Sequence, residues 1–326
     1  MKISIYDKSL NRICIVGEQF ISCLWVEGYN TIEPFTLELN DTEEYRNKVK
    51  LDYYVGRADR KSLMVIKSVS ISDGKIVVSG KQASQVLDDV AFVGTIGENK
   101  YVDEVIPEKY SQSAKWENVE FAETDLGVKY PAQISHKSFR ELCEIICQET
   151  DVGFVAKRQD KKVFVEFYQP QPKENLVFSQ RFGNLKIKDI LLSNTNYKNY
   201  AIVLGVGEGE NRKRVDVDLS DGGVRREIII DAKDIGYEDD DTDETYNKKL
   251  YARGVEKMLE RSQTQRVGFL PISGDFASRF DLGDVITISL PEYSLKLTSR
   301  VMRFSQKAQS NKVDTTVEVG KMTIKR

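Results

Sequence analysis

Apolar and polar residues alternate with a period of two along most of the chain, which is the pattern of strands with one buried face. Within residues 1–90 this alternation predicts short strands at "KISIYD", "NRICIVG", "PFTLELN" and "KSLMVIKSVSISDGKIVVSGK". Asp73 and Gly74 interrupt the last segment, and an Asp-Gly pair between alternating runs predicts a hairpin turn. A first strand-rich unit therefore ends near residue 90, where "KQASQVLDDVAF" changes to a helical spacing.

Residues 91–180 are predicted to form a mixed α+β domain. The segment 91–136 is polar and irregular, with Trp116 and Phe121 as candidate anchors. A helix is expected from Ser138 to about Glu149, because Ser138 and Glu141 have the spacing of a capping box. One face of this helix carries Phe139, Leu142, Cys143, Ile146 and Cys147. The segment "GFVAKRQDKKVFVEFYQP" then predicts two strands joined by a turn.

Residues 181–326 return to short alternating strands, with a helical insertion predicted near 243–263. The acidic run "EDDDTDE" leads into this helix, and Thr242 or Asp243 is expected to cap it. A calcium loop starting at Asp239 would need glycine at its sixth position, where the chain has Glu244. The predicted fold class is therefore mainly β with α+β insertions.

The stretch "GVGEGENRKR" has the glycine content of a phosphate-binding loop. Such loops require a helix start after the glycines, because the helix N-terminus binds the phosphate. Here Glu210 occupies the position of the third glycine, and the residues from Arg214 onward alternate as a strand. The pattern favours the loop of a β-hairpin, and no nucleotide is expected.

Composition excludes several classes of protein. The chain of 326 residues is 40% hydrophobic with a net charge of −3, which is typical of a soluble protein of two or three domains without a strong affinity for nucleic acid. No apolar run is long enough for an export signal or a membrane span. Four scattered cysteines do not form a disulfide framework, and Cys143 and Cys147 are interpreted as core residues rather than as a metal pair.

Candidate catalytic chemistry is sparse. His136 is the only histidine, so any Ser-His or Cys-His site must include it, and its context predicts a surface position in a loop. With 51 acidic residues some carboxylate pair is certain to occur, so such a pair is no evidence for a glycosidase site. Tyr53, Tyr54 and Tyr168 either stack on sugars or pack between strands, and packing is the more common role. We expect no catalytic, cofactor-binding or metal-binding residues and no enzyme activity.

Five blocks of the sequence stand out together: "FISCLWVEGYNTIEPFTLELN", "VSGKQASQVLDDVAF", "LVFSQRFGNLKIKDILLSNTNYKNYAIVLGVGEG", "GGVRREIIIDAKDI" and "FDLGDVITI". These blocks resemble one family, the hub proteins at the tail tips of long-tailed, siphovirus-type phages and prophages. They follow the family's order and cover most of the chain. The resemblance extends to the hub proteins of the T-even and Mu phages and to the N-terminal module of tail-associated lysins.

The resemblance implies a phage tail hub with two small β-barrels per chain, at 1–90 and 181–326. Three subunits would form a ring of six barrels that joins the tail tube and distal tail proteins to the tip or baseplate. A tip fibre or a lysin is a further candidate partner, and DNA passes only as cargo through the channel. The expected location is the tail tip of the virion, after assembly in the host cytoplasm.

Two other classes of function stay open at this point. One is a peptidoglycan hydrolase acting through carboxylates, and the other is a module that binds host glycans. Because the chain ends at Arg326 soon after its last predicted strands, we expect any wall hydrolase to lie on another chain.

Overall fold

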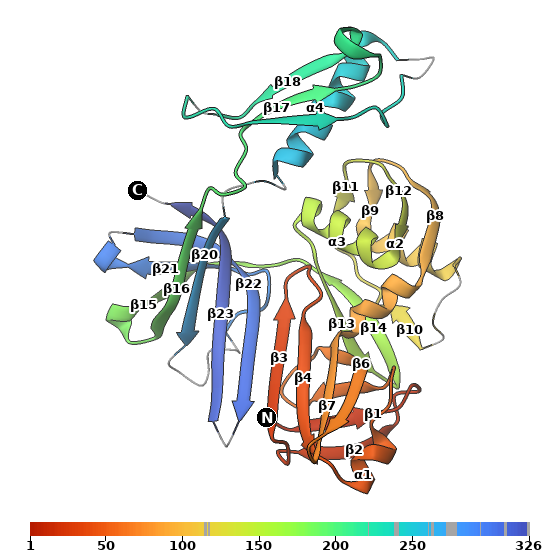
Figure 1. The fold of residues 1–326 in the computed structure, drawn as a ribbon, viewed down its shortest axis with the longest axis vertical. Helices are drawn as coiled ribbons and strands as arrows, with labels where there is room; N and C mark the ends of the chain where they lie inside the picture. The colour runs from red at the N-terminus through yellow and green to blue at the C-terminus, as the bar shows by residue number, and fades with distance from the viewer. Residues whose placement is uncertain are drawn as a thin grey trace. The chain divides into compact units, whose positions relative to one another are not determined.

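The computed structural model describes residues 1–113, 116, 118–220, 222–237, 241–259, 261, 264–271, 279–293, 295–309 and 312–324. The chain divides into two compact units, which Figure 1 shows as ribbons. Unit 1 consists of Met1–Lys188 and Gly268–Arg326, and unit 2 of Asp189–Val267. Strands hold 49% of the chain and helices 20%, so the predicted mainly-β class is confirmed. The division at 90 and 180 and the two barrels remain predictions.

The N-terminal part of unit 1 is an antiparallel sheet with one short helix. Its elements are β1 (Ile3–Tyr6), β2 (Arg12–Gly17), β3 (Ser22–Gly28), β4 (Pro34–Asn40), α1 (Glu43–Lys48), β5 (Tyr54–Arg57), β6 (Leu63–Ser72) and β7 (Lys75–Gln82). The strand order is β3-β4-β7-β6-β5-β1-β2.

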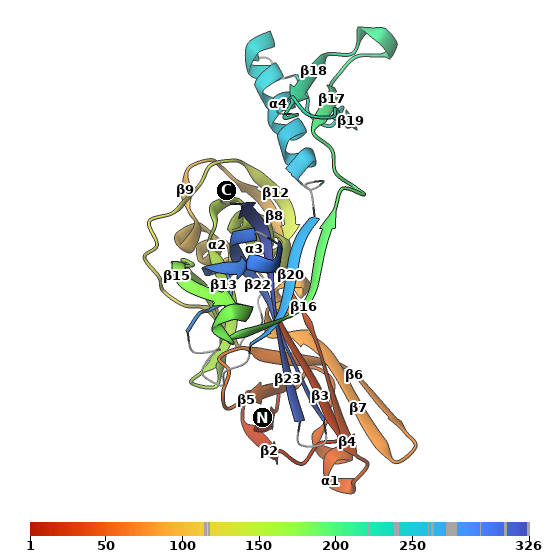
Figure 2. The same cartoon turned by 90° about the vertical axis from the view of Figure 1, so that its left-hand side faces the viewer.

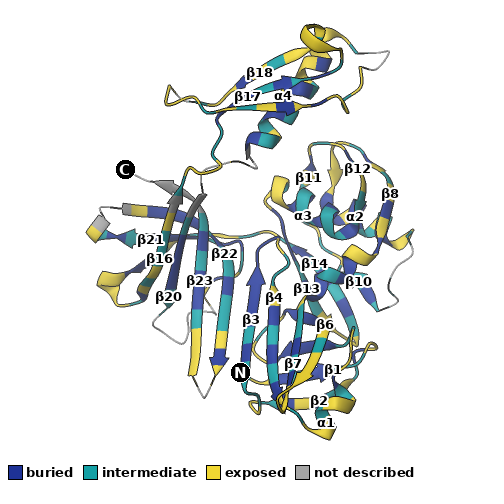
Figure 3. Ribbon diagram, viewed as in Figure 1, coloured by how far each residue is buried: buried dark blue, intermediate teal, exposed yellow. Residues whose placement is uncertain are grey.

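Alternation explains how these strands bury one face. In β4 the residues Phe35, Leu37 and Leu39 are buried and their neighbours are not. They join a core that includes Trp25 on β3, and β3 is buried throughout its last four residues (Figure 3). The predicted Asp73-Gly74 hairpin is confirmed, with both residues at positive φ between β6 and β7.

The C-terminal strands of the chain extend the same sheet. They are β15 (Pro172–Ser179), β16 (Leu185–Ser193), β20 (Thr264–Pro271), β21 (Val285–Leu290), β22 (Leu295–Gln309) and β23 (Lys312–Ile324), with 3-10 turns η2 (Gln180–Phe182) and η5 (Pro291–Tyr293). The order β16-β20-β23-β22 continues directly into β3. Residues 303–309 of β22 pair with residues 22–28 of β3 (Figures 1 and 2). An N-terminal strand and a C-terminal strand of the chain are therefore hydrogen-bonded to each other.

The middle of unit 1 packs two helices and several short strands around a second core. Its elements are η1 (Ala83–Asp89), β8 (Ala91–Ile96), β9 (Lys100–Tyr101), α2 (Val102–Ser111), β10 (Val119–Phe121), β11 (Lys129–Tyr130), β12 (Ile134–Ser138), α3 (Phe139–Thr150), β13 (Gly153–Gln159) and β14 (Lys162–Tyr168). Helix α3 packs against α2 and η1. The predicted capping box of Ser138 and Glu141 is present, and the predicted apolar face of α3 is fully buried.

Two expectations for this region are corrected. The helical spacing of 81–92 gives only the 3-10 turn η1, and Phe92 already belongs to strand β8. The segment 91–136, expected to be irregular, contains α2 and the strands β8 to β12. Helix α2 escaped prediction because Pro107 lies inside it, and proline usually breaks a helix at such a position.

Unit 2 is a three-stranded sheet covered on one face by a helix. Its elements are β17 (Tyr200–Leu204), η3 (Gly209–Asn211), β18 (Arg214–Asp218), β19 (Glu227–Asp231) and α4 (Asp243–Leu259), with strand order β18-β17-β19. Val203 and Val217 pack against Tyr246 and Leu250 of α4. Gly254 lets the helix approach this sheet, because a Cβ there would lie 2.7 Å from Val217.

Candidate functional site: a basic pocket beside a buried polar network

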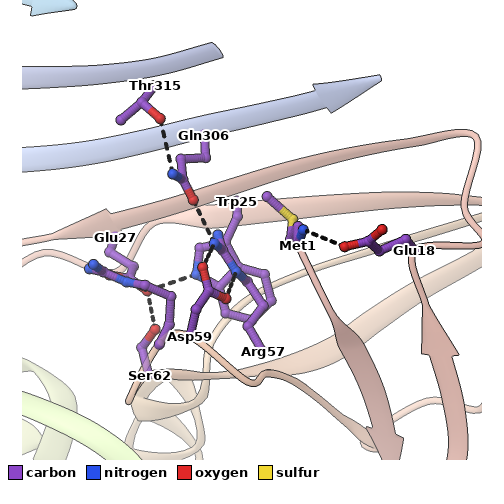
Figure 4. A network of polar contacts seen from close by, with 10 residues as sticks. Met1, Glu18, Trp25, Glu27, Arg57, Asp59, Ser62, Gln306 and Thr315 are labelled. Atoms are coloured by element: carbon purple, nitrogen blue, oxygen red, sulfur yellow. Dashed lines mark hydrogen bonds and ion pairs between the residues drawn. The ribbon is translucent and has the colours of Figure 1, made fainter. Parts of the chain in front are cut away.

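A charged side chain, that of Glu27 on β3, is buried in unit 1. Its side chain is only 3% exposed. Trp25 Nε1 donates a hydrogen bond of 2.7 Å to the Glu27 carboxylate, and Ser62 donates to it as well (Figure 4). Arg60 is the third donor to this carboxylate. Because Arg60 and Ser62 belong to the loop between β5 and β6, the carboxylate ties this loop to β3.

The protonation of Glu27 follows from these contacts. Burial by itself would raise the pKa of the carboxyl group, because a charge is costly in a low-dielectric interior. The Arg60 charge and the hydrogen bonds from Arg60, Ser62 and Trp25 outweigh burial and lower the pKa of Glu27 below its ordinary value. Glu27 is therefore ionised at neutral pH and forms a buried ion pair with Arg60.

Arg57 extends the network to the C-terminal strands. Its guanidinium lies 5.3 Å from the centre of the Trp25 ring and donates to Asp59 and, at 2.6 Å, to Gln306 of β22. Gln306 in turn donates to Thr315 of β23 at 3.0 Å (Figure 4). The network therefore links strands from both ends of the chain.

A small pocket adjoins the loop that carries Arg60. Its volume is about 200 Å³, and its lining residues are Tyr6, Gly56, Arg57, Arg60, Lys61, Leu63, Lys157 and Arg158. Gly56 forms part of the floor, since a Cβ there would lie 3.0 Å from the Tyr6 ring and 3.3 Å from Leu63. Side chains alternate along β5, so the Arg57 guanidinium lies on the opposite face, toward Trp25.

The pocket holds more positive than negative charge. Arg60 pairs with Glu27, and Lys157 pairs with Glu166. Among the described residues, neither Lys61 nor Arg158 has a carboxylate partner. Burial, followed by the charge of Lys61, lowers the pKa of Lys157 even though Glu166 is in contact with it. Several positive charges around one pocket repel one another, and an anion bound there would relieve this repulsion. The pocket is therefore electrostatically suited to an anion.

Arg158 is held in place at the edge of the pocket. Its guanidinium lies over the Tyr6 ring, 4.6 Å from the ring centre, and Nη2 is 3.5 Å from the carbonyl oxygen of Leu10. A guanidinium that rests on an aromatic ring keeps its in-plane N–H groups available for a carboxylate or a phosphate. The wall of the pocket is fixed by the backbone bridge between Ser62 and Lys157.

The residues singled out in the sequence do not gather at this pocket. Cys143 and Cys147 are buried in α3, which confirms their interpretation as core residues. Within the described part of the chain, no group of three or more His, Cys, Asp or Glu residues is arranged to hold a metal ion. His136 is exposed as expected, but it lies at an irregularity in strand β12 with a φ of 49°, rather than in a loop.

The glycine-rich stretch is the hairpin loop that its pattern predicted. Strands β17 and β18 pair antiparallel on either side of it, with Leu204 opposite Arg214. Gly207 has a φ of 112°, a conformation that favours glycine. The acidic run is described only from Asp241 onward, so Asp239 lies outside the described residues. Thr242 accepts a hydrogen bond from the Thr245 N–H and caps α4, as expected.

The candidate tyrosines pack inside the fold. Tyr54 is fully buried, and Tyr168 donates a hydrogen bond of 3.0 Å to the carbonyl oxygen of Leu282. Burial raises the pKa of Tyr168. Tyr53 is partly buried against the N-terminal core. The packing role that the sequence favoured therefore describes these side chains better than sugar stacking.

Sequence patterns did not identify the network or the pocket. Glu27 was the one available signal, because it interrupts the apolar segment "CLWVEGY" at a position where a strand is buried. The pocket combines residue 6, five residues between 56 and 63, and residues 157 and 158, which only the tertiary fold brings together.

The family model for Siphovirus ReqiPepy6 Gp37-like proteins matches residues 95–321 of the chain. The fold is similar to the 43 kDa tail protein of prophage MuSo2 from Shewanella oneidensis, with a TM-score of 0.65, 12% identity and 98% of each chain covered. It is also similar to a tail protein from Neisseria meningitidis, with a TM-score of 0.63, 10% identity and coverage of 98% of this chain and 96% of that one.

A third similar structure is the prophage tail protein gp18 from Listeria monocytogenes, with a TM-score of 0.57, 9% identity and coverage of 98% of this chain and 94% of that one. No curated protein sequence matches the chain. Among the helices described, none is both long and apolar enough to cross a membrane. The resemblance to phage tail proteins stated from the sequence is confirmed.

Proposed function

Because the chain belongs to the family of Siphovirus ReqiPepy6 Gp37-like proteins, we propose that it is the hub protein at the distal end of a siphovirus-type phage or prophage tail. The observation that carries the proposal is the similarity to prophage tail proteins over nearly the whole of both chains. This similarity in fold covers 98% of the chain in each case and supports a role in the tail. The hub would join the tail tube and distal tail proteins to the baseplate and host-recognition parts.

The proposed assembly is a homotrimer, with two small barrels per chain at 1–90 and 181–326 and the α+β domain at 91–180 between them. Three subunits close into a ring through heterologous contacts. Six barrels would match a sixfold tail tube on one side, and three subunits would match threefold tip parts on the other. Within one chain, the pairing of β22 with β3 joins strands from 1–90 and 181–326 in one sheet, which is compatible with two barrels that lie side by side.

Light scattering of the purified chain, alone and mixed with the tail-tube and distal tail proteins of the same phage, tests the assembly. We expect a particle containing three 37.2 kDa chains, formed alone or nucleated by the tail proteins. Obligate assemblies of this kind bury roughly 2,000 Å² or more per interface, so the trimer should persist on dilution. A stable dimer, or a chain that stays monomeric with all its proposed partners, contradicts the trimer.

We further propose that the chain has a structural role without catalysis. Purified protein incubated with Gram-positive and Gram-negative sacculi, with and without zinc or calcium, should release no soluble fragments. It should also show no retention on immobilised host glycans. Fragment release that one carboxylate substitution abolishes would replace the structural proposal with a wall hydrolase, and saturable glycan retention would replace it with a binding module.

A further inference from the structure

The pocket beside the Glu27 network has the features of a built site. Two of its cations are already neutralised, Arg60 by Glu27 and Lys157 by Glu166. Lys61 and Arg158 add charge that no described carboxylate balances. The pocket walls are fixed by the buried ion pair on one side and by the Ser62–Lys157 bridge on the other. A preorganised cationic site costs little reorganisation when an anion enters.

The size of the pocket limits its ligand. Pockets that enclose cofactors and drug-sized molecules measure roughly 300–1,000 Å³, whereas this pocket measures about 200 Å³. A nucleotide is therefore too large to be enclosed, and a single side chain is of suitable size. Gly56 lets Tyr6 and Leu63 pack closely at the pocket, since a Cβ at this position would lie 3.0 Å from the Tyr6 ring and 3.3 Å from Leu63.

The lining also distinguishes between kinds of anion. Tyr6, Gly56 and Leu63 are the uncharged lining residues of the pocket, and the other lining residues are cations. A glutamate side chain matches both parts, because its methylene groups can contact the apolar floor while its carboxylate meets Lys61 and the Arg158 guanidinium. A phosphodiester group has no apolar stem that could contact the uncharged lining residues. It would therefore interact only with the cations.

We propose that this pocket receives one glutamate side chain from an acidic segment of a partner protein. Arg158 donates from its in-plane N–H groups, and Lys61 and Lys157 complete the cationic wall. The apolar floor of Tyr6 and Leu63 carries the stem of the side chain. The inference holds whether or not the chain is a tail hub, so its test is independent of the trimer.

Titration of the full chain with acetyl-Gly-Glu-Gly-amide and acetyl-Gly-Gln-Gly-amide at low ionic strength tests the proposal. Isothermal calorimetry and NMR shifts of the Arg and Lys side chains should detect saturable binding of the Glu peptide in the millimolar range and none of the Gln peptide. In the double variant Lys61→Gln/Arg158→Gln the Glu peptide should bind at least about tenfold more weakly, because a hydrogen bond to a charged group contributes that much or more.

Controls and competing ligands complete the test. Lys75→Gln, at an exposed lysine of the β6–β7 hairpin, should leave binding unchanged. If the double variant does not fold, the single charge reversal Lys61→Glu serves in its place. Equal binding of both peptides, absence of binding by either, or an unaffected double variant overturns the proposal. Tighter binding of inorganic phosphate or a short oligothymidylate than of the Glu peptide also overturns it and identifies a phosphate site.

Discussion

Replacing Glu27 by Gln tests whether the buried ion pair holds β3 to the loop between β5 and β6. The carboxylate accepts hydrogen bonds from three donors, one of them the charged Arg60. A carboxamide has one acceptor oxygen, so its NH2 group must face at least one of these donors. Removing one partner of a buried pair costs about 3–5 kcal/mol. Arg60 keeps 20% exposure and lies over the Phe304 ring, so we expect a loss of about 2–4 kcal/mol.

Urea unfolding followed by tryptophan fluorescence measures this loss, because Trp25 is fully buried and donates to Glu27. The matched control is Glu38→Gln, at a partly buried position on β4 opposite Ser22, where we expect a change within about 0.5 kcal/mol. A Glu27→Gln variant that loses less than about 1 kcal/mol, or no more than the control, would refute the structural role of the pair.

The pH dependence of stability provides a second measure of the same pair. The folded-state pKa of Glu27 is below its unfolded value, so the stabilisation is complete above the unfolded pKa and disappears as the pH falls through the folded pKa. The stability difference between the wild type and Glu27→Gln should therefore shrink as the pH falls below the ordinary glutamate value. A difference that stays constant through the acidic range would show that the charge is not involved.

Three further predictions concern packing and backbone conformation. Gly283→Ala should cost about 2–4 kcal/mol in urea unfolding, because φ is +89° and the Cβ would lie 2.4 Å from the Tyr29 ring, whereas Gly127→Ala, at positive φ in open space, should cost about 1 kcal/mol. The four cysteines are buried and burial raises their pKa values, so Ellman's reagent should react with them only after unfolding; rapid reaction of the native protein would contradict their core positions. Replacing the three glycines of 205–209 by alanine should impair folding of unit 2 in circular dichroism; saturable ATP or NAD binding that the triple variant loses would instead restore the nucleotide hypothesis.

Local signals predicted the elements whose cause is local. Strand β4 was predictable because every second residue is apolar, and α3 because its capping box and apolar stripe lie within 12 residues. The hairpins at Asp73-Gly74 and between β17 and β18 follow from turn chemistry. The prediction of α2 failed because Pro107 is a local signal against a helix. The burial of Val105 and Ile106 in the tertiary structure outweighs this signal.

The features that depend on residues far apart in the sequence had no local signal in the sequence. No pattern in residues 22–28 indicates that they pair with residues 303–309, because alternation defines a strand and not its neighbour. The pocket depends on β1, the loop after β5 and the β13–β14 hairpin meeting in space. The lysines and arginines that line it resemble any other solvent-exposed cations in the sequence.

Cryo-electron microscopy of the tail tip of a phage that carries this chain tests the central proposal most directly. We predict three copies of the chain in a closed ring at the distal end of the tail tube, with similar small barrels at about 1–90 and 181–326 arranged around a central channel. Density showing the chain elsewhere in the virion, copies that cannot close with threefold symmetry, or no pair of similar barrels in each subunit would contradict the hub assignment.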